Sequence, residues 1–355
     1  MMTVARRVAL SAVAGCFSWG AMSMTMAAPT SLGTGNSDGP REIIVAQDGS
    51  GQFKTVQEAI AAAPTGTPAH PSVIHIKPGI YKEVIYAQRE KRFLRLIGDG
   101  AAPAATVITY DLNAHAVGPD GKPIGTFRTA TANIDADDLT IENLTFENAA
   151  GNTGQALAVR VDGDRVVFRK CRLLGWQDTL LANRGRQYFE ECEITGAVDF
   201  IFGGATAYFE RCQLHCAGTG YVTAASTPDN QAYGFVFSHC KIDATPAAPV
   251  AVAGAAPATP APVQTYLGRP WRDYASVVFL NTEMSDVVRS AGWSDWGKLE
   301  RAKTARYAEF GNTGAGSGPQ GRVDWMKHLT DDQAKALTPL RVLGGADHWD
   351  PTAST

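Results

Sequence analysis

The feature that most constrains the fold is a pattern, Phe-x-x-Cys-x-Leu/Ile, that recurs four times in the middle of the chain. The copies are "FRKCRL" at 168, "FEECEI" at 189, "FERCQL" at 209 and "FSHCKI" at 237, so they start 21, 20 and 28 residues apart. Apolar and polar residues alternate inside each copy, as in a strand, and a period in the low twenties with variable insertions is typical of a solenoid. The sequence therefore predicts an all-β chain coiled into a parallel β-helix, with one copy in each rung.

Equivalent positions on stacked rungs form ladders along such a coil, because neighbouring strands lie about 4.8 Å apart. We expect one internal stack of aromatic rings, made by Phe168, Phe189, Phe209 and Phe237. Cysteines form the neighbouring ladder, and its spacing lies within the Cα range of a disulfide, so we predict a bond between Cys192 and Cys212. No second ligand pair follows "CQLHC" at 212–216 at zinc-like spacing, so we expect neither a metal site nor a cofactor.

Two capping boxes predict short helices near the ends of the coil. Thr55 with Glu58 opens "TVQEAIAAAP", whose apolar positions suit a lid over the first rung. Thr330 with Gln333 opens a second short helix near the C-terminus. Both helices are expected to cover rungs that have no neighbour of their own.

Composition divides the chain into a leader and one large domain. The segments are an export signal at 1–28, a flexible leader at 29–41, a β-helix domain at 42–345 that contains an exposed, mobile Ala/Pro-rich loop at 244–263, and a C-terminal tail at 346–355. Arg6 and Arg7 precede the apolar run "VALSAVAG", and small residues end at Ala28, so we expect a secreted protein that begins near Pro29. The alternative is that "VAGC" is a lipoprotein signal whose Cys16 carries a lipid.

Overall charge and hydrophobicity exclude several classes of partner. The net charge is -3 and 45% of the residues are hydrophobic, which describes a globular domain with a large core and no basic surface for nucleic acid. Apolar stretches are shorter than the ~20 residues of a membrane span. We expect a monomer without a membrane span.

Two aspartates occupy the same place on successive rungs. Asp178 follows Cys171 by seven residues, and Asp199 follows Cys192 by seven. At this offset the next rungs carry Thr219 and Ala247, so the acidic pair is not a property of the repeat. Two carboxylates about one strand spacing apart repel each other, which raises the pKa of one of them and suits acid/base chemistry.

Uncharged amides and one cation accompany the aspartates. Gln177 adjoins Asp178, Gln155 is expected on the preceding rung, and Arg269 lies in "YLGRPWR". Together with these, the segments "GIYKE", "RTAT", "GQALAVRV", "GWQDTL", "GAVDFIFG" and "LGRPWR" resemble, in order and spacing, the signature segments of pectin methylesterases, carbohydrate esterase family 8. The resemblance spans roughly residues 42–325.

This resemblance implies a right-handed parallel β-helix that hydrolyses the methyl esters of galacturonate in pectin. It implies Asp199 as nucleophile, Asp178 as general acid/base, Gln155 and Gln177 as donors to the oxyanion, and Arg269 as the partner of Asp199. It also implies a sugar-binding surface lined by Trp271, Phe202 and, in "RTAT", Thr129. The residue types fit acyl transfer, since amides can stabilise the oxyanion and a cation keeps a carboxylate charged.

Several rival functions remain on the residues alone. A glycoside hydrolase would also use two carboxylates about 5 Å apart; an acyl thioesterase or a non-catalytic carbohydrate-binding protein could use the same scaffold. "GNSDG" at 35–39 matches the serine hydrolase motif but lies in the leader, without the strand and helix that a nucleophile elbow needs. A calcium-dependent lyase would need more acidic ligands than this pair.

Overall fold

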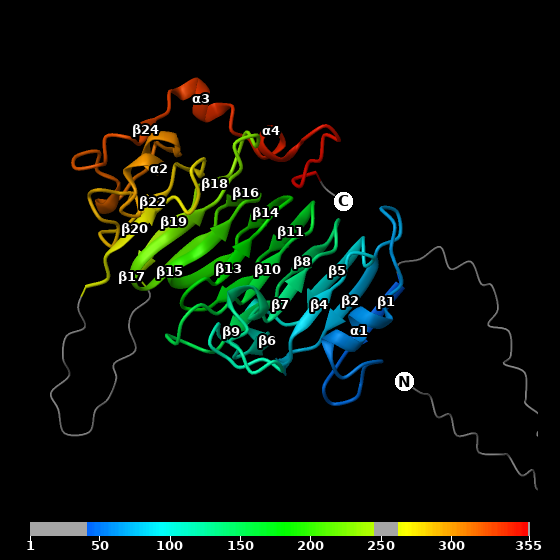
Figure 1. Ribbon diagram of the computed structural model, residues 1–355. Coiled ribbons are helices and arrows are strands. Elements are labelled where there is room, and N and C mark those ends of the chain that lie inside the picture. Colours follow the sequence, from blue (N-terminus) through cyan, green and yellow to red (C-terminus); the bar gives the residue numbers. More distant parts are fainter. Residues whose placement is uncertain (1–40, 245–261, 354–355) are drawn as a thin grey trace, which may run out of the picture. The chain divides into compact units, whose positions relative to one another are not determined.

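The computed structural model describes residues 41–244 and 262–353, which form parallel strands and few short helices (Figure 1). The predicted export signal at 1–28, Cys16, "GNSDG", nearly all of the leader at 29–41 and most of the loop at 244–263 lie outside these residues. The strands build a coil with three faces, here called faces 1, 2 and 3. Through the middle of the coil, each turn of the chain adds one strand to each face.

Face 1 is a sheet of eleven strands within the described residues, and neighbours in the sheet are successive rungs. Its strands, in order, are β1 (Arg41–Val45), β2 (Ser72–Ile76), β5 (Leu94–Gly98), β8 (Thr140–Glu142), β11 (Val166–Arg169), β14 (Arg186–Glu190), β16 (Thr206–Glu210), β18 (Phe235–Ser238), β21 (Ser276–Leu280), β23 (Arg306–Phe310) and β24 (Lys327–His328). Every pair is parallel, as the coil requires, so all rungs run in one direction around it.

Faces 2 and 3 are joined by two long strands that bend from one face to the other, β15 (Glu193–Gly203) and β17 (Gln213–Ala225). Face 2 also contains β3 (Gly79–Lys82), β6 (Thr106–Tyr110), β9 (Thr145–Asn148), β12 (Arg172–Leu174), β19 (Lys241–Ala244) and β22 (Glu283–Met284). Face 3 also contains β4 (Ile85–Ala87), β7 (Ala132–Ile134), β10 (Val159–Val161), β13 (Leu180–Ala182) and β20 (Thr265–Gly268). The predicted all-β parallel β-helix is therefore confirmed.

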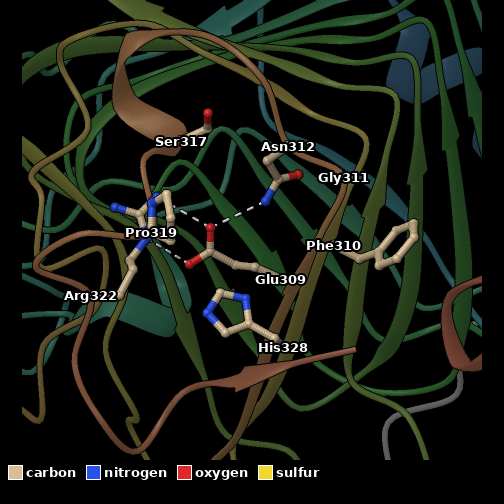
Figure 2. Close-up of a pocket in the computed structure, with 8 residues that line it drawn as sticks. All are labelled: Glu309, Phe310, Gly311, Asn312, Ser317, Pro319, Arg322 and His328. Carbon is tan, nitrogen blue, oxygen red and sulfur yellow. Dashed lines mark hydrogen bonds and ion pairs between the residues drawn. The ribbon is translucent and has the colours of Figure 1, made fainter. Parts of the chain in front are cut away.

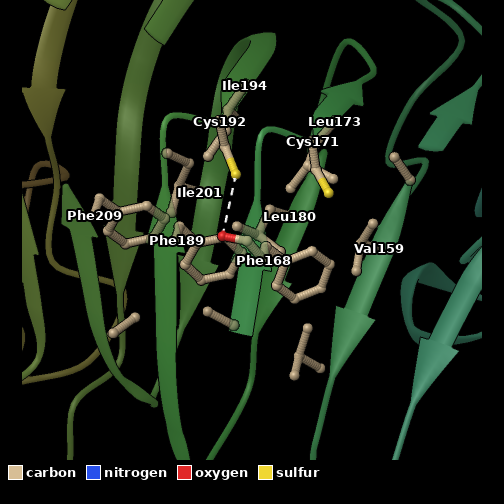
Figure 3. Close-up of a cluster of buried hydrophobic side chains, with 14 of the residues drawn as sticks. Val159, Phe168, Cys171, Leu173, Leu180, Phe189, Cys192, Ile194, Ile201 and Phe209 are labelled. Carbon is tan, nitrogen blue, oxygen red and sulfur yellow. Dashed lines mark hydrogen bonds between the residues drawn. The ribbon is translucent and has the colours of Figure 1, made fainter. Parts of the chain in front are cut away.

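An aromatic ladder fills the coil behind face 1 (Figure 3). Successive rings stack almost parallel, with centroids 4.8 Å apart for Phe168 and Phe189, 4.6 Å for Phe189 and Phe209, and 4.4 Å for Phe209 and Phe237. Phe279 extends the stack by one more rung at 4.5 Å. This confirms the predicted internal stack, and the in-register pairing of the strands is what brings equivalent rings together.

The cysteine ladder is present, but the predicted disulfide between Cys192 and Cys212 is absent, and both are free, buried thiols. Each thiol lies near main-chain carbonyl oxygens, Cys192 Sγ 3.4 Å from that of Glu190 and Cys212 Sγ 3.5 Å from that of Phe189. Side chains at equivalent positions of parallel rungs point the same way, whereas a disulfide needs two Cβ atoms that face each other. The distance between ladder positions was therefore not sufficient to predict a disulfide.

The corner between faces 1 and 2 is made by a single residue in the left-handed backbone region. Its φ angle is 51° at Lys170, 52° at Glu191, 52° at Arg211 and 52° at His239. Each of these residues directly precedes a ladder cysteine. One left-handed residue bends the chain from face 1 into face 2, which lets the phenylalanine and the cysteine of one repeat face the same core.

Helix α1 (Val56–Ala62) covers the first rungs, as predicted. The Thr55 hydroxyl accepts a hydrogen bond from the Glu58 amide at 3.3 Å, and Val56 and Ile60 are buried in the main core. A 3₁₀ turn follows at Pro103–Ala105 and another at Thr126–Arg128. In the described part of the chain no helix has the length and apolar character needed to cross a membrane.

The C-terminal segment contains α2 (Leu299–Thr304), a 3₁₀ turn (Ala315–Ser317), α3 (Asp331–Lys335) and α4 (Pro339–Leu343). Its last part, with α3 and α4, packs along the outside of face 1, whereas the 3₁₀ turn contacts β22 of face 2. The predicted capping box of Thr330 with Gln333 is present at α3, and α4 contacts β14 and β16 (Figure 1). Asp347, in the predicted tail, makes ion pairs with Arg165 and Arg186, so the start of this tail is fastened to the coil.

Candidate active site

Asp178 and Asp199 lie on neighbouring rungs, where face 2 turns into face 3. A parallel bridge joins Gln177 to Val198, the residues that precede them, and the Asp178 amide donates to the Val198 carbonyl oxygen at 3.0 Å. The two aspartates are therefore about one strand spacing, ~4.8 Å, apart along the coil. Their exposed fractions are only 8% and 6%, so both carboxyl groups are largely shielded from water.

Arg269 binds both carboxylate oxygens of Asp199. Its Nε lies 2.9 Å from Oδ1 and its Nη2 lies 2.6 Å from Oδ2, the two-point geometry that a guanidinium makes with a carboxylate. Arg269 directly follows β20, and its amide donates to the Thr223 carbonyl oxygen at 3.0 Å. The backbone of the coil thus fixes the origin of the arginine side chain.

These surroundings make the two acids unequal. Burial raises the pKa of Asp178, the charge of Asp199 raises it further, and Arg269 lowers it only in part, so it reaches about 8. Burial also raises the pKa of Asp199, but hydrogen bonds from Arg269 oppose this effect directly. Near pH 7 the arrangement favours a protonated Asp178 beside an ionised Asp199.

Two aromatic residues that the sequence reasoning missed hold Arg269 between them. Its guanidinium carbon lies 3.8 Å from the centroid of the Tyr221 ring and 3.7 Å from that of Trp296. A guanidinium stacked on aromatic faces keeps its edge free for a carboxylate. The sequence did contain a signal for Trp296, the short motif "WSDW" at 293–296. Two tryptophans lie close together there, outside the predicted rungs.

The amides of Gln155 and Gln177 lie on the same outward ladder as this group. Parallel bridges run from Gln155 to Gln177 and from Gln177 to Val198, which confirms that Gln155 belongs to the preceding rung. Both glutamines are half-buried, and neither side-chain amide makes a hydrogen bond to any residue in the described ranges. Their N–H groups are therefore available to a ligand above Asp178 and Asp199.

The predicted sugar-binding residues divide into two groups. The rings of Phe202 and Trp271 contact each other, with centroids 5.8 Å apart and an interplanar angle of 58°, and Trp271 is partly exposed. Thr129, in contrast, is fully buried, and its hydroxyl donates to the Thr126 carbonyl oxygen and accepts from the Leu157 amide. Thr129 supports the backbone in this structure and presents no side-chain surface to a sugar.

The constant number of residues between the ladder cysteine and the site position does not hold on the rung after Asp199. Gly196 pairs with Cys216, but Val198 pairs with Tyr221, so β17 contains three more residues than β15 over this interval. Tyr221, and not Gly218, therefore continues the ladder of Gln177 and Val198, and Thr219 does not occupy the rung position of Asp178 and Asp199. The other residue expected at this offset, Ala247, lies outside the described residues.

A separate pocket of about 190 Å³ lies near the C-terminal rungs (Figure 2). Its charged residues bind one another: Arg322 Nε lies 2.9 Å from Glu309 Oε1, and Asn312 Nδ2 lies 3.2 Å from Glu309 Oε2. Trp293 donates to the same carboxylate at 3.0 Å. This satisfied, buried network holds the last rungs together and contains none of the predicted catalytic residues.

Comparison with known proteins shows the family of this chain. The family model described as "Pectinesterase" matches residues 42–346. This chain belongs to the pectinesterase family. Members of this family are carboxylic ester hydrolases, which is the activity class that the resemblance of the sequence segments implied.

Individual relatives cover most of the chain. It is 38% identical over 300 residues to pectinesterase 31 of Arabidopsis thaliana, a match that spans 83% of this chain and 89% of the relative. Its structure is similar to that of the pectin methylesterase from carrot, with a TM-score of 0.77, 35% identity, and coverage of 88% and 96%. A pectin methylesterase solved in complex with a hexasaccharide matches with a TM-score of 0.71, 30% identity, and coverage of 88% and 98%.

Proposed function

We propose that this pectinesterase removes the methyl esters of galacturonate units in pectin by two acyl transfers through Asp199. The observation that carries the proposal is the unequal acid pair: Arg269 binds Asp199, while burial and the neighbouring charge raise the pKa of Asp178 to about 8. One ionised and one protonated carboxyl group, on adjacent rungs, are what a nucleophile and a general acid require.

In the first step a carboxylate oxygen of Asp199 attacks the ester carbonyl carbon. The negative charge that develops on the carbonyl oxygen is stabilised by N–H groups of Gln155 and Gln177. The bond from carbon to the methoxy oxygen then breaks, and Asp178 gives its proton to this oxygen, which leaves as methanol. The product of this step is an anhydride between Asp199 and the galacturonate carbonyl.

In the second step water attacks the anhydride, and the ionised Asp178 takes one of its protons. The bond from the carbonyl carbon to the Asp199 oxygen breaks, which restores the carboxylate of Asp199 and the acid form of Asp178. The free galacturonic acid ionises and departs as a unit of pectate. Arg269 stays bound to Asp199 and limits the rise of its pKa while the anion is shielded from water.

Phe202 and Trp271 are proposed to contact the sugar chain through their ring faces, since Trp271 is partly exposed beside the site. We propose that the protein acts outside the cell as a monomer, exported by residues 1–28, with lipidation of Cys16 as the alternative. Recovery of acylated protein in a membrane fraction would decide for the alternative.

The test is methanol release from highly methylated pectin by the wild type and by Asp199→Asn. The wild type should release methanol without new reducing ends, and the variant should release none. New reducing ends would indicate a glycoside hydrolase, and turnover of acyl thioesters with no methanol release would indicate a thioesterase. Binding of pectin without turnover by the wild type would indicate a carbohydrate-binding protein.

A further inference from the structure

The ladder that carries Gln155 and Gln177 continues beyond the catalytic acids. Val198 pairs with Tyr221, and Tyr221 pairs with Tyr266 on the next rung, where the two rings stack at 5.4 Å with an interplanar angle of 12°. A parallel bridge between Thr265 and Val288 then brings Arg289 into register with Tyr266. Arg289 therefore lies three rungs from Val198, or about 14 Å along the coil at the usual strand spacing.

Arg289 points outward on this ladder. Its neighbour Val288 is buried in the core, while the Arg289 guanidinium carbon lies 5.1 Å from the centroid of the Tyr266 ring. In the described part of the chain the Arg289 side chain makes neither an ion pair nor a hydrogen bond, and its Nε is buried without a partner. Arg269, on the same side of the coil, is by contrast bound through two nitrogens to Asp199.

A pocket of about 280 Å³ adjoins Arg289. Besides Arg289 its lining contains one charged residue, the exposed Asp286, which forms no ion pair with any described residue. The pocket therefore offers a carboxylate one stacked cation with free N–H donors, and one acid that weakens the attraction. A planar guanidinium backed by an aromatic ring suits a carboxylate, which it can hold through two hydrogen bonds.

We infer that Arg289 and Tyr266 form a subsite for an ionised, unesterified galacturonate unit of the same chain whose ester reacts at Asp199. The inference rests on the proposed function and adds a charge preference to it. A polysaccharide laid along the outward ladder meets the glutamines at the reacting unit and Arg289 about three rungs further on. The enzyme then favours chains that already carry free carboxylates and are long enough to span this distance.

The experiment compares two substrates for Arg289→Ala: methanol release from fully methylated pectin and from pectin of intermediate methylation. We expect kcat/KM to fall about tenfold on the partly methylated substrate, the usual effect of removing one exposed charge-assisted pair. On the fully methylated substrate, kcat/KM should stay within about twofold of the wild-type value, because this substrate has no free carboxylate for Arg289 to bind. Equal losses on both substrates, or none on either, would overturn the subsite.

Two further variants separate this effect from general changes in charge or folding. Arg341→Ala removes an exposed arginine on α4, which packs against face 1, and should leave both substrates unaffected. Asp286→Asn removes the opposing acid and should instead tighten binding of an unesterified hexagalacturonate, measured by calorimetry, while Arg289→Ala weakens it. If Arg341→Ala loses as much kcat/KM on the partly methylated substrate as Arg289→Ala does, the effect is due to net charge and not to a subsite.

The proposed function and the subsite can fail separately. No methanol release from either substrate by the wild type would reject the proposed function, whereas the calorimetric binding tests the subsite alone.

Discussion

Asp178 and Asp199 share a left-handed backbone conformation, with φ angles of 64° and 51°, in addition to their equivalent places on adjacent rungs. This conformation is unfavourable for most residues with a side chain, although aspartate and asparagine tolerate it better than others. Strain of this kind persists where the surrounding structure holds it, and it is common at active sites.

The shared conformation leads to the first prediction. Asp199→Asn should abolish methanol release while it keeps the wild-type fold, since asparagine tolerates positive φ and retains an acceptor for Arg269. Asp199→Ala should be equally inactive but about 1 kcal/mol less stable than Asp199→Asn, because alanine is strained at positive φ. Urea unfolding of both variants gives the comparison, and turnover by a folded Asp199→Asn would reject this residue as nucleophile.

The raised pKa of Asp178 sets the alkaline side of the pH–rate profile. The proposed first step needs a protonated Asp178, whose pKa is about 8, so kcat/KM should fall as the pH rises through about 8. Asp178→Asn, which cannot exchange a proton, should lose at least 10²-fold in turnover, the usual effect of removing a general acid/base. Initial rates between pH 5 and 10 test this, and an alkaline limb that stays flat past pH 9 would contradict the assigned role.

Asp178 should also make the protein less stable as the pH rises. In the folded protein it binds its proton up to pH about 8, whereas in the unfolded chain it releases the proton near its ordinary pKa of about 4. The folded state holds the extra proton between these values, so this contribution to stability falls as the pH increases from about 4 to about 8. Asp178→Asn should thus gain stability over the wild type from pH 4 to pH 7, on the order of 2–4 kcal/mol. Denaturant unfolding at the two pH values measures the gain, and an equal difference at both would contradict it.

The aromatic clamp on Arg269 predicts a kinetic signature. Trp296→Ala removes one of the two rings, so Arg269 should bind Asp199 less firmly and the pKa of Asp199 should rise. We expect kcat to fall at least tenfold, with the acidic limb of the pH–rate profile moved upward. Trp296→Phe, which keeps a ring, should restore much of the activity and bring the limb back. If Trp296→Ala lowers the melting temperature but leaves the acidic limb of the pH–rate profile unchanged, Trp296 stabilises the fold and does not affect the pKa of Asp199.

The free thiols predict stability that does not depend on oxidation. Because Cys192 and Cys212 form no bond, the melting temperature should be the same with and without a strong reductant. A disulfide would contribute about 2–4 kcal/mol, and its reduction would lower the melting temperature by several degrees. Such a drop would show that this pair is oxidised in solution.

The sequence was informative wherever rungs have equal length. Phe168 and Phe189 stack, and Asp178 and Asp199 are neighbours, because 21 residues complete one turn of the coil at both places. The three additional residues in β17 ended this regularity, so Tyr221 was not found by counting. An insertion inside a rung changes no local pattern that periodicity can detect.

Other features depend on directions in space, which spacing does not give. Trp296 reaches Arg269 from a segment outside the repeat, at a residue with a left-handed backbone. Thr129 lies in a matching motif, yet its hydroxyl is used by the backbone of neighbouring turns. The cysteines have suitable spacing for a disulfide, but their side chains run parallel. Thr129 and the cysteines were recognisable from the sequence, but the directions of their side chains were not.

The succession of rungs from Gln155 to Arg269 also implies an order of assembly in time. Each rung of the coil is held mainly by the rung before it and the rung after it, so a chain synthesised from its N-terminus can stack its rungs as they emerge. Asp178 and Asp199 would then be in place well before Arg269 and Trp296 are made. Until those late residues arrive, two acids share a shielded corner without their cation. The ion pair between Arg269 and Asp199, on which the proposed division of roles depends, can therefore form only after the rung that carries Arg269 has stacked.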